Sequence, residues 1–436
     1  MSASKHTLAE LPGDAPNPAH TRSFLPETLI IASAWLVTIA VALILTAAKG
    51  VPSPLRILLH EVGDNVNRNW YWVGAVLPAN LVAIAAARSS SERIRIAAGA
   101  TIIALACAAL SATFYDIKTA IYFGTKCCAI FGMLVMAWQG RRPGGKERLL
   151  VVLMFATYLA IRLSYLPLTY MMRRDTFDLY TFAFDSSLGF NIAGFLFFLS
   201  HRIHLVGALL NAVYVFVLML PLSLYAAQSY RRDPQVAPML RVFIMATMLG
   251  FLCYLVFPVS GPLYFLGSGE IDRALLTGAP HVVEFHASLR NGMPSVHFGI
   301  ALLMLLNVPR SLRSVRLAFV IYCGLTAMAT MGNGEHYLSD LLAALPFVCA
   351  VQNFSLWLNA PRSSRHLLAG VRSLAVFAGF LDFLILAPET TRAAPYSWAI
   401  VVLLVAHFAW ERRGWMLRGQ NSLPLPASGP VAQSID

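Results

Sequence analysis

The chain has 436 residues, of which 58% are hydrophobic and only 12% are charged. Soluble domains contain roughly 45–50% apolar and about 25% charged residues, so this composition excludes an ordinary soluble domain and favours a chain folded within a bilayer. The formal charge of +12 does not indicate a nucleic-acid partner, because the Arg and Lys residues form short clusters between apolar runs and no basic stripe on a soluble module.

Residues 1–26 are polar and rich in Pro and Ala, which indicates a disordered cytoplasmic tail. Twelve apolar runs follow, most of them near the roughly 20 residues needed to cross the hydrocarbon core. The runs span residues 29–47, 70–87, 96–114, 121–138, 149–168, 203–227, 242–259, 296–308, 317–331, 337–358, 367–386 and 398–410. The prediction is an all-α fold, a polytopic transmembrane helical bundle of about twelve spans, with a second disordered tail at residues 419–436.

Basic residues cluster in alternate loops, which the positive-inside rule assigns to the cytoplasm. The clusters are Arg88, Arg93 and Arg95; Arg141, Arg142, Lys146 and Arg148; Arg231 and Arg232; Arg310, Arg313 and Arg316; Arg362 and Arg365; and Arg412, Arg413 and Arg418. Their alternation supports both the span count and a cytoplasmic N-terminus. The compact loops and short tails favour a bacterial inner membrane.

Two segments depart from the plain helix pattern. Residues 175–200 carry Asp178 and Asp185 among aromatic residues, which suits an amphipathic or re-entrant segment at the outer boundary. The loop over residues 260–294 is the longest between two spans and is predicted to lie on the same outer side. Loops of that length are usually functional.

The string Arg290-Asn291-Gly292-Met293-Pro294-Ser295-Val296-His297 leads directly into an apolar run. Pro294 and Ser295 are residues that start helices, and Gly292 lets the backbone turn closely. Exposed backbone N–H groups at such a turn can hold a phosphate with the help of the Ser295 hydroxyl. His297 then lies in the first helical turn and faces the same site.

A second string, Gly332-Asn333-Gly334-Glu335-His336-Tyr337-Leu338-Ser339-Asp340, also opens an apolar run. His336 and Asp340 are four residues apart, so on a helix they share one face and the carboxylate can fix the imidazole tautomer. This is the arrangement that activates a nucleophile. Both strings are predicted at the outer boundary, where His297 and His336 can meet.

Pro-Ser-Val-His followed by Glu-His-Tyr-Leu-Ser-Asp resembles the second and third signature motifs of the type-2 phosphatidic acid phosphatase and haloperoxidase superfamily. The His-Tyr-x-x-Asp form is most similar to the inositolphosphotransferase, phosphorylceramide synthase-like branch. The resemblance covers residues 175–358, and residues 257–262 look like a weak first motif. It implies a six-helix catalytic core within residues 171–358, with N-terminal helices at 27–170 and C-terminal helices at 359–418.

The resemblance also implies roles for the residues that match. His336 would be the nucleophile that forms a phosphohistidine, Asp340 its orienting partner, and His297 the acid that protonates the leaving alcohol. Ser295 would bind phosphate oxygens. No metal and no organic cofactor are implied.

The chain departs from the family pattern in its basic residues. Ala329-Thr330 stands where many members have Ser-Arg, Val296 stands where many have Gly, and the usual Lys and Arg-Pro of the first motif are missing. Positive charge is still needed to stabilise the transferring phosphoryl group. Arg290 is the best candidate because it adjoins the Ser295 turn, and Arg273, Arg202 and Lys126 are weaker ones.

Alternative interpretations stay open for several residues. Arg290 would also suit an arginine that anchors the chain at the headgroup level, and Asp178 and Asp185 are better explained as helix caps or interfacial polar residues than as catalysts. A metal site at His281, Glu284 and His286 is disfavoured because no fourth ligand lies at helical spacing. The six cysteines lie in or beside apolar runs without metal-ligand spacing, which argues against a disulfide framework.

Three functions compete. The first is a phosphotransferase that moves a phosphate or phospho-headgroup from a lipid donor to an alcohol or sugar acceptor at the periplasmic, non-cytoplasmic face. The second is a lipid phosphate phosphatase that uses the same residues with water as acceptor, since acceptor choice depends on the shape of the site. The third is a non-enzymatic lipid transporter or flippase whose intramembrane polar residues line a path. The oligomeric state is open.

Overall fold

The fold is taken from a computed structural model of the 436-residue chain. It describes residues 79–84, 86–113, 117–140, 169, 174–218, 220–221, 224, 236–267, 276, 278–284, 290–308, 312–359, 364–391 and 393–421, with single positions at 33, 36, 37, 40 and 44. The predicted N-terminal tail, the runs at 29–47 and 149–168, most of the run at 70–87 and most of the C-terminal tail lie outside the described residues.

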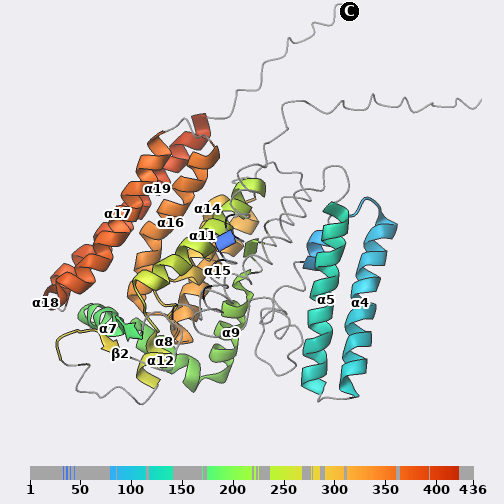
Figure 1. Cartoon of the computed structure of the whole chain (residues 1–436), viewed down its shortest axis with the longest axis horizontal. Coiled ribbons are helices and arrows are strands. Elements are labelled where there is room, and N and C mark those ends of the chain that lie inside the picture. Colours follow the sequence, from blue (N-terminus) through green and yellow to red (C-terminus); the bar gives the residue numbers. More distant parts are fainter. Residues whose placement is uncertain are drawn as a thin grey trace, which may run out of the picture.

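The first long helices that the structure describes form a hairpin beside the rest of the bundle (Figure 1). They are α4, Ser90–Ala112, and α5, Ile117–Gly140. Ser89 begins α4 as its N-cap, because its hydroxyl accepts the Glu92 N–H at 3.2 Å. Gly124 lets the two helices approach closely, since a Cβ there would lie 2.4 Å from the Ala104 carbonyl oxygen.

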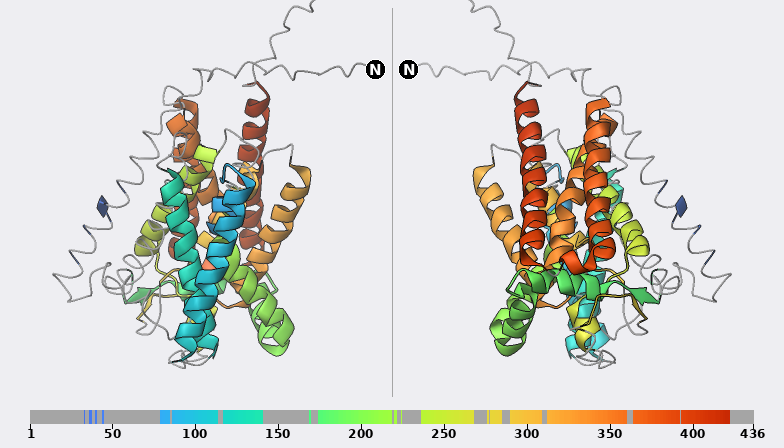
Figure 2. Two further views of the ribbon diagram at one scale, coloured as in Figure 1. Left: turned by 90° about the vertical axis from the view of Figure 1, so that its right-hand side faces the viewer. Right: turned by 90° about the vertical axis from the view of Figure 1, so that its left-hand side faces the viewer.

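The central helix of the bundle is α16, Leu338–Asn359, which packs against α7, α11, α14, α17 and α19. Of its most apolar stretch, 72% of the residues are buried, against 39% for α15 and α17 and 17% for α4 and α19. The other described helices of the bundle are α9, His204–Val215; α11, Val236–Val256; α14, Val296–Asn307; α15, Arg313–Gly332; α17, Ser364–Leu386; and α19, Ala394–Asn421. Of these, α15 packs against α8, α9 and α14. α17 and α19 run side by side and are joined by α18, Pro388–Thr391 (Figure 2).

Short elements gather at one end of the bundle, where α16 begins (Figure 1). They are α7, Asp178–Ser187; α8, Ile192–Arg202; α12, Pro262–Gly267; and a two-stranded antiparallel pair of β1, Asp175–Thr176, with β2, Val283–Glu284. A 3-10 turn, η2, Phe216–Leu218, follows α9. α7 lies across the end of α16 and α17, and α8 turns away from it by 97°. This bend matches the predicted departure from a plain helix over residues 175–200.

Within the described residues, five helices are long and apolar enough to cross a membrane, or six if the bent pair α7 and α8 counts as one span. An all-α integral membrane protein is therefore confirmed for the described residues. Shorter apolar segments also lie in α5, α9, α11 and α14, and each of them overlaps an apolar run that the sequence predicts as a span. The count of twelve spans and the six-helix core are not established and stay predictions.

Candidate active site

The two predicted strings meet at the end of the bundle where the short elements gather. The Ser295 N–H donates to the Asp340 carbonyl oxygen at 3.1 Å, which ties the start of α14 to the first turn of α16. The His297 and His336 ring centroids lie 6.5 Å apart. Segments about forty residues apart in the sequence therefore bring two imidazoles to one place, as the topology prediction requires.

His336 and Asp340 form a fully buried pair. His336 Nδ1 lies 3.3 Å from Asp340 Oδ2, which also accepts the Tyr337 N–H at 2.8 Å. An ionised carboxylate only accepts hydrogen bonds, so a neutral His336 carries its proton on Nδ1 and its lone pair on Nε2. Nε2 is buried and makes no hydrogen bond to any described part of the protein. It is the ring atom left for chemistry.

His297 is held at the start of α14 by packing against an aromatic ring. Tyr214 of α9 stacks on the imidazole with ring centroids 4.2 Å apart and an interplanar angle of 23°. Ser295 is the N-cap of α14, and its hydroxyl lies 3.5 Å from the Phe298 N–H. The sequence prediction of a helix start with His297 in its first turn is therefore observed.

Gly292 is explained by the contact of two loops. Its N–H donates to the Val259 carbonyl oxygen at 2.7 Å, and a Cβ at Gly292 would lie 2.6 Å from Val259 Cγ1. Only glycine fits such a close approach without displacing the neighbouring loop. Gly292 belongs to the turn that was predicted to bind the substrate phosphate, but its own N–H joins residues 257–262 to the histidine-bearing turn.

Arg290 is fully buried, which is unusual for an arginine and requires polar partners. Its Nη1 donates to the Ser260 hydroxyl at 2.8 Å, and its Nη2 donates to the Arg174 carbonyl oxygen at 2.8 Å. A position inside the protein argues against the alternative of a headgroup anchor at the lipid surface. Arg290 ties together the segments before α7, before α12 and before α14.

Among the other basic candidates, Arg202 is exposed at the end of α8 and Lys126 is buried on α5. Arg273 lies outside the described residues.

Asp178 caps a loop far away in the sequence. Its carboxylate accepts the Ser260 N–H at 2.8 Å and the Gly261 N–H at 2.9 Å, and it also accepts the Thr176 hydroxyl. Gly261 has a φ of 91°, and a Cβ there would lie 2.3 Å from the Glu335 carbonyl oxygen. The weak first-motif region is thereby pressed against the loop that carries His336.

Asp185 caps the central helix. Its two carboxylate oxygens accept the Leu338 N–H at 2.6 Å and the Ser339 N–H at 2.9 Å, at the first residues of α16. Anionic groups are stabilised at a helix N-terminus by its unpaired N–H groups and dipole.

Burial raises the pKa of Asp185 to about 7 and that of Asp178 to about 6, and the backbone N–H donors oppose this rise. α7, which bears both, lies across the bundle end and is not one of the long spans. The interpretation of both aspartates as caps fits the contacts, although each caps a segment other than its own helix.

The disfavoured metal site at His281, Glu284 and His286 lies only partly within the described residues. Within the described ranges no group of three His, Cys, Asp or Glu residues could hold a metal ion. His281 Nδ1 is 2.9 Å from the Ala279 carbonyl oxygen, Glu284 lies in β2, and His286 is outside those ranges.

The end of the bundle thus brings together a buried histidine oriented by a carboxylate, a second histidine beside it and a capped helix start. Residues 180–354 match the family model of the PAP2 superfamily, and this segment contains both strings, Asp185 and the whole of α14 and α15. No curated protein and no solved structure matches the chain. The match supports the PAP2 superfamily and a lipid phosphatase or phosphotransferase type of function for the segment that carries the site.

Proposed function

We propose that the protein is a membrane-embedded phosphotransferase that moves a phosphate or phospho-headgroup from a lipid donor through a phosphohistidine on His336. The observation that carries the proposal is the state of His336: Nδ1 is held by Asp340, and Nε2 is buried and accepts no hydrogen bond from the described residues. A nucleophile with its second nitrogen fixed by a carboxylate is oriented before substrate arrives.

The reaction has two balanced steps. In the first, His336 Nε2 attacks phosphorus, the bond to the leaving oxygen breaks, and protonated His297 gives its proton to the departing alkoxide. In the second, His297 takes the proton of the acceptor alcohol as its oxygen attacks phosphorus, and the N–P bond breaks. The 6.5 Å between the ring centroids lets both imidazoles reach one phosphoryl group.

The phosphate oxygens need donors and positive charge in the transition state. Ser295 at the start of α14, with the helix N-terminus behind it, is the proposed binder. Arg290 supplies the charge. Its buried guanidinium donates to the buried Ser260 hydroxyl. A charge inside the protein acts over a longer range than it would in water. Gly292 contributes by allowing the loop contact with Val259.

The second candidate is a lipid phosphate phosphatase, in which water replaces the alcohol in the second step. The burial of His336 favours transfer, because a site closed to solvent limits hydrolysis of the phosphoenzyme. The inositolphosphotransferase-like His-Tyr-x-x-Asp form supports the same choice. The site lies at the end of the bundle away from the basic clusters at Arg313 and Arg365, which supports a non-cytoplasmic, periplasmic location in a bacterial inner membrane.

The test compares purified wild type with His336→Ala, His297→Ala and the control His204→Ala, which alters an exposed histidine at the start of α9. Phosphate release and headgroup transfer are measured on a panel of lipid phosphates, with acid-labile phosphoenzyme trapped in parallel. We expect turnover to fall by at least about 10⁴-fold in His336→Ala, as for removal of other nucleophiles. The trapped adduct disappears in that variant, and His204→Ala stays at the wild-type rate.

The outcomes separate the three functions. Transferred product identifies the transferase, and free phosphate alone in the presence of alcohol acceptors identifies the phosphatase. Lipid movement in proteoliposomes that survives His336→Ala would contradict both and leave the transporter.

A further inference from the structure

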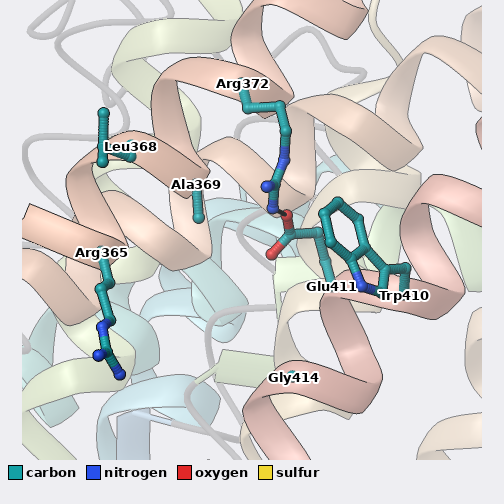
Figure 3. Close-up of a pocket in the computed structure, with 7 residues that line it drawn as sticks. All are labelled: Arg365, Leu368, Ala369, Arg372, Trp410, Glu411 and Gly414. Carbon is teal, nitrogen blue, oxygen red and sulfur yellow. Dashed lines mark hydrogen bonds and ion pairs between the residues drawn. The ribbon is translucent and has the colours of Figure 1, made fainter.

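A second polar site lies at the opposite end of α16 from His336. A cavity of about 480 Å³ opens between α17 and α19 and is lined by Arg365, Leu368, Ala369, Arg372, Trp410, Glu411 and Gly414. Figure 3 shows Arg372 and Trp410 beside Glu411, with Arg365 further along α17. His336 and Asn353, which borders this region, are separated by about 25 Å along the helix axis at 1.5 Å per residue. The cavity is therefore separate from the candidate active site.

One face of α17 forms the first wall. Arg365, Leu368, Ala369 and Arg372 follow the i, i+3, i+4, i+7 spacing of a single helix face. This face offers a positive charge at each end and an apolar surface between them. Arg365 and Leu368 are exposed, so the face opens outward where α17 begins.

The second wall fixes Arg372 in place. Glu411 of α19 is 2% exposed and pairs with Arg372, whose guanidinium lies 4.0 Å from the centre of the Trp410 ring. Asn353 of α16 donates to Glu411 Oε2 at 3.1 Å and accepts the Trp415 indole N–H at 3.0 Å. The half-exposed guanidinium is thus held by contacts anchored on the buried Glu411 and Asn353, which do not depend on a ligand, and less side-chain freedom is lost when a ligand binds.

The charge balance of the groove selects an anion. Two arginines face one glutamate, and Arg412 and Arg413 are exposed on the same turn of α19. Arginine guanidinium matches the oxygens of a phosphate, and a basic groove at the boundary of a membrane attracts anionic lipid. A lipid whose phosphate sits between Arg365 and Arg372 can place its acyl chains along the exposed apolar surface of α17 and α19.

We propose that this groove binds the phosphate headgroup of an anionic phospholipid from the leaflet opposite the candidate active site. Such a lipid joins α17 to α19 and, through Glu411 and Asn353, to the central helix. It stabilises the bundle and takes no part in the chemistry at His336.

The test is a lipid titration of the full-length protein in detergent micelles, with the unfolding temperature read by intrinsic fluorescence. The added lipid is phosphatidylglycerol, phosphatidylcholine or, as a soluble phosphate, glycerol 3-phosphate. We expect phosphatidylglycerol to raise the unfolding temperature and the other two to have little effect, because a ligand that binds only the folded state stabilises it. Arg365→Gln should weaken the apparent affinity about fivefold, as expected for one charge near a lipid surface.

Arg313→Gln is the matched control, since Arg313 is an exposed arginine at the start of α15 on the same side of the bundle but outside the groove. If Arg313→Gln and Arg365→Gln weaken the apparent affinity for phosphatidylglycerol equally, the lipid is attracted to the charged surface in general and the proposal is overturned. The proposal also fails if phosphatidylglycerol has no effect on the unfolding temperature of the wild type. A double variant, Arg372→Gln with Glu411→Gln, removes both members of the ion pair and so avoids a lone buried charge. It should weaken binding further. Weaker lipid binding in Arg365→Gln, with phosphate transfer unchanged, would support the groove independently of the proposed function.

Discussion

At the residue scale, the His336–Asp340 pair is the feature that sequence spacing predicts best. Four residues on a helix fix the relative direction of two side chains whatever the rest of the fold does. The pair is observed with a 3.3 Å contact although His336 itself precedes α16 by two residues. Spacing does not reveal burial, and it is burial that leaves Nε2 without a competing hydrogen bond in the described protein.

We expect Asp340→Asn to lower turnover by about 10⁴-fold while the protein stays folded, by analogy with loss of the orienting aspartate in other histidine-containing catalytic sites. An amide at this position offers a donor as well as an acceptor, so His336 Nδ1 is no longer required to carry the proton. The measurement is the single-turnover rate of phosphoenzyme formation. The unfolding temperature serves as the check on folding, and a wild-type rate of adduct formation in Asp340→Asn would remove the orienting role.

At the element scale, the sequence predicts some helix boundaries more closely than others, because turn residues mark some helix ends and only a change in hydropathy marks the rest. The run predicted at 337–358 agrees with α16, Leu338–Asn359, because its start is marked by a turn and its end by loss of apolar residues. The run at 398–410 falls short of α19, Ala394–Asn421. Hydropathy marks where the bilayer ends, whereas the helix continues through Arg412 and Arg413 into the polar region.

Loop contacts are the part of the site that the sequence does not reveal. Asp185 and the start of α16 are separated by 153 residues, and no periodicity connects them. The same holds for Asp178 and Ser260, and for the Val259–Gly292 contact. A sequence shows that an aspartate suits a helix N-terminus, but only the packing of α7 across the bundle end selects which N-terminus it caps.

We expect Asp185→Ala to destabilise the protein by about 1–3 kcal/mol, because it leaves the part-buried Leu338 N–H and the buried Ser339 N–H without the carboxylate that accepts them. Asp185→Asn keeps one acceptor oxygen and should therefore lower the free energy of unfolding by a smaller amount. The readout is the unfolding temperature in detergent, with Asp382→Asn, an exposed position on α17, as the control. If Asp185→Ala unfolds at the wild-type temperature, the cap is not a stabilising contact.

At the scale of the whole molecule, α17 has one end near the candidate active site and the other at the groove between α17 and α19. Glu389 of α18 follows its last turn and Ser364 is its first residue, and both are exposed. The alternation of basic clusters predicts that the Ser364 end is cytoplasmic. This orientation of the protein in the membrane is inferred from the distribution of basic residues, because the fold alone does not show which end faces the cytoplasm.

We expect a membrane-impermeant maleimide to label Glu389→Cys in intact cells and to label Ser364→Cys only after the membrane is opened. The six native cysteines are buried or partly buried free thiols, and the wild-type chain gives the background. The reverse labelling pattern would invert the topology and place the histidines at the cytoplasmic face.

The closure of the candidate site has a kinetic consequence. His336, Ser295 and Arg290 are all 0% exposed, so a substrate reaches Nε2 only when the elements that cover it move apart. On the proposed mechanism every turnover includes such an opening, whose frequency depends on the friction of the surrounding bilayer. The rate of reaction is then governed by membrane fluidity as well as by the reactivity of the phosphate ester, and cooling into an ordered lipid phase slows the enzyme more steeply than the bond-breaking step alone requires.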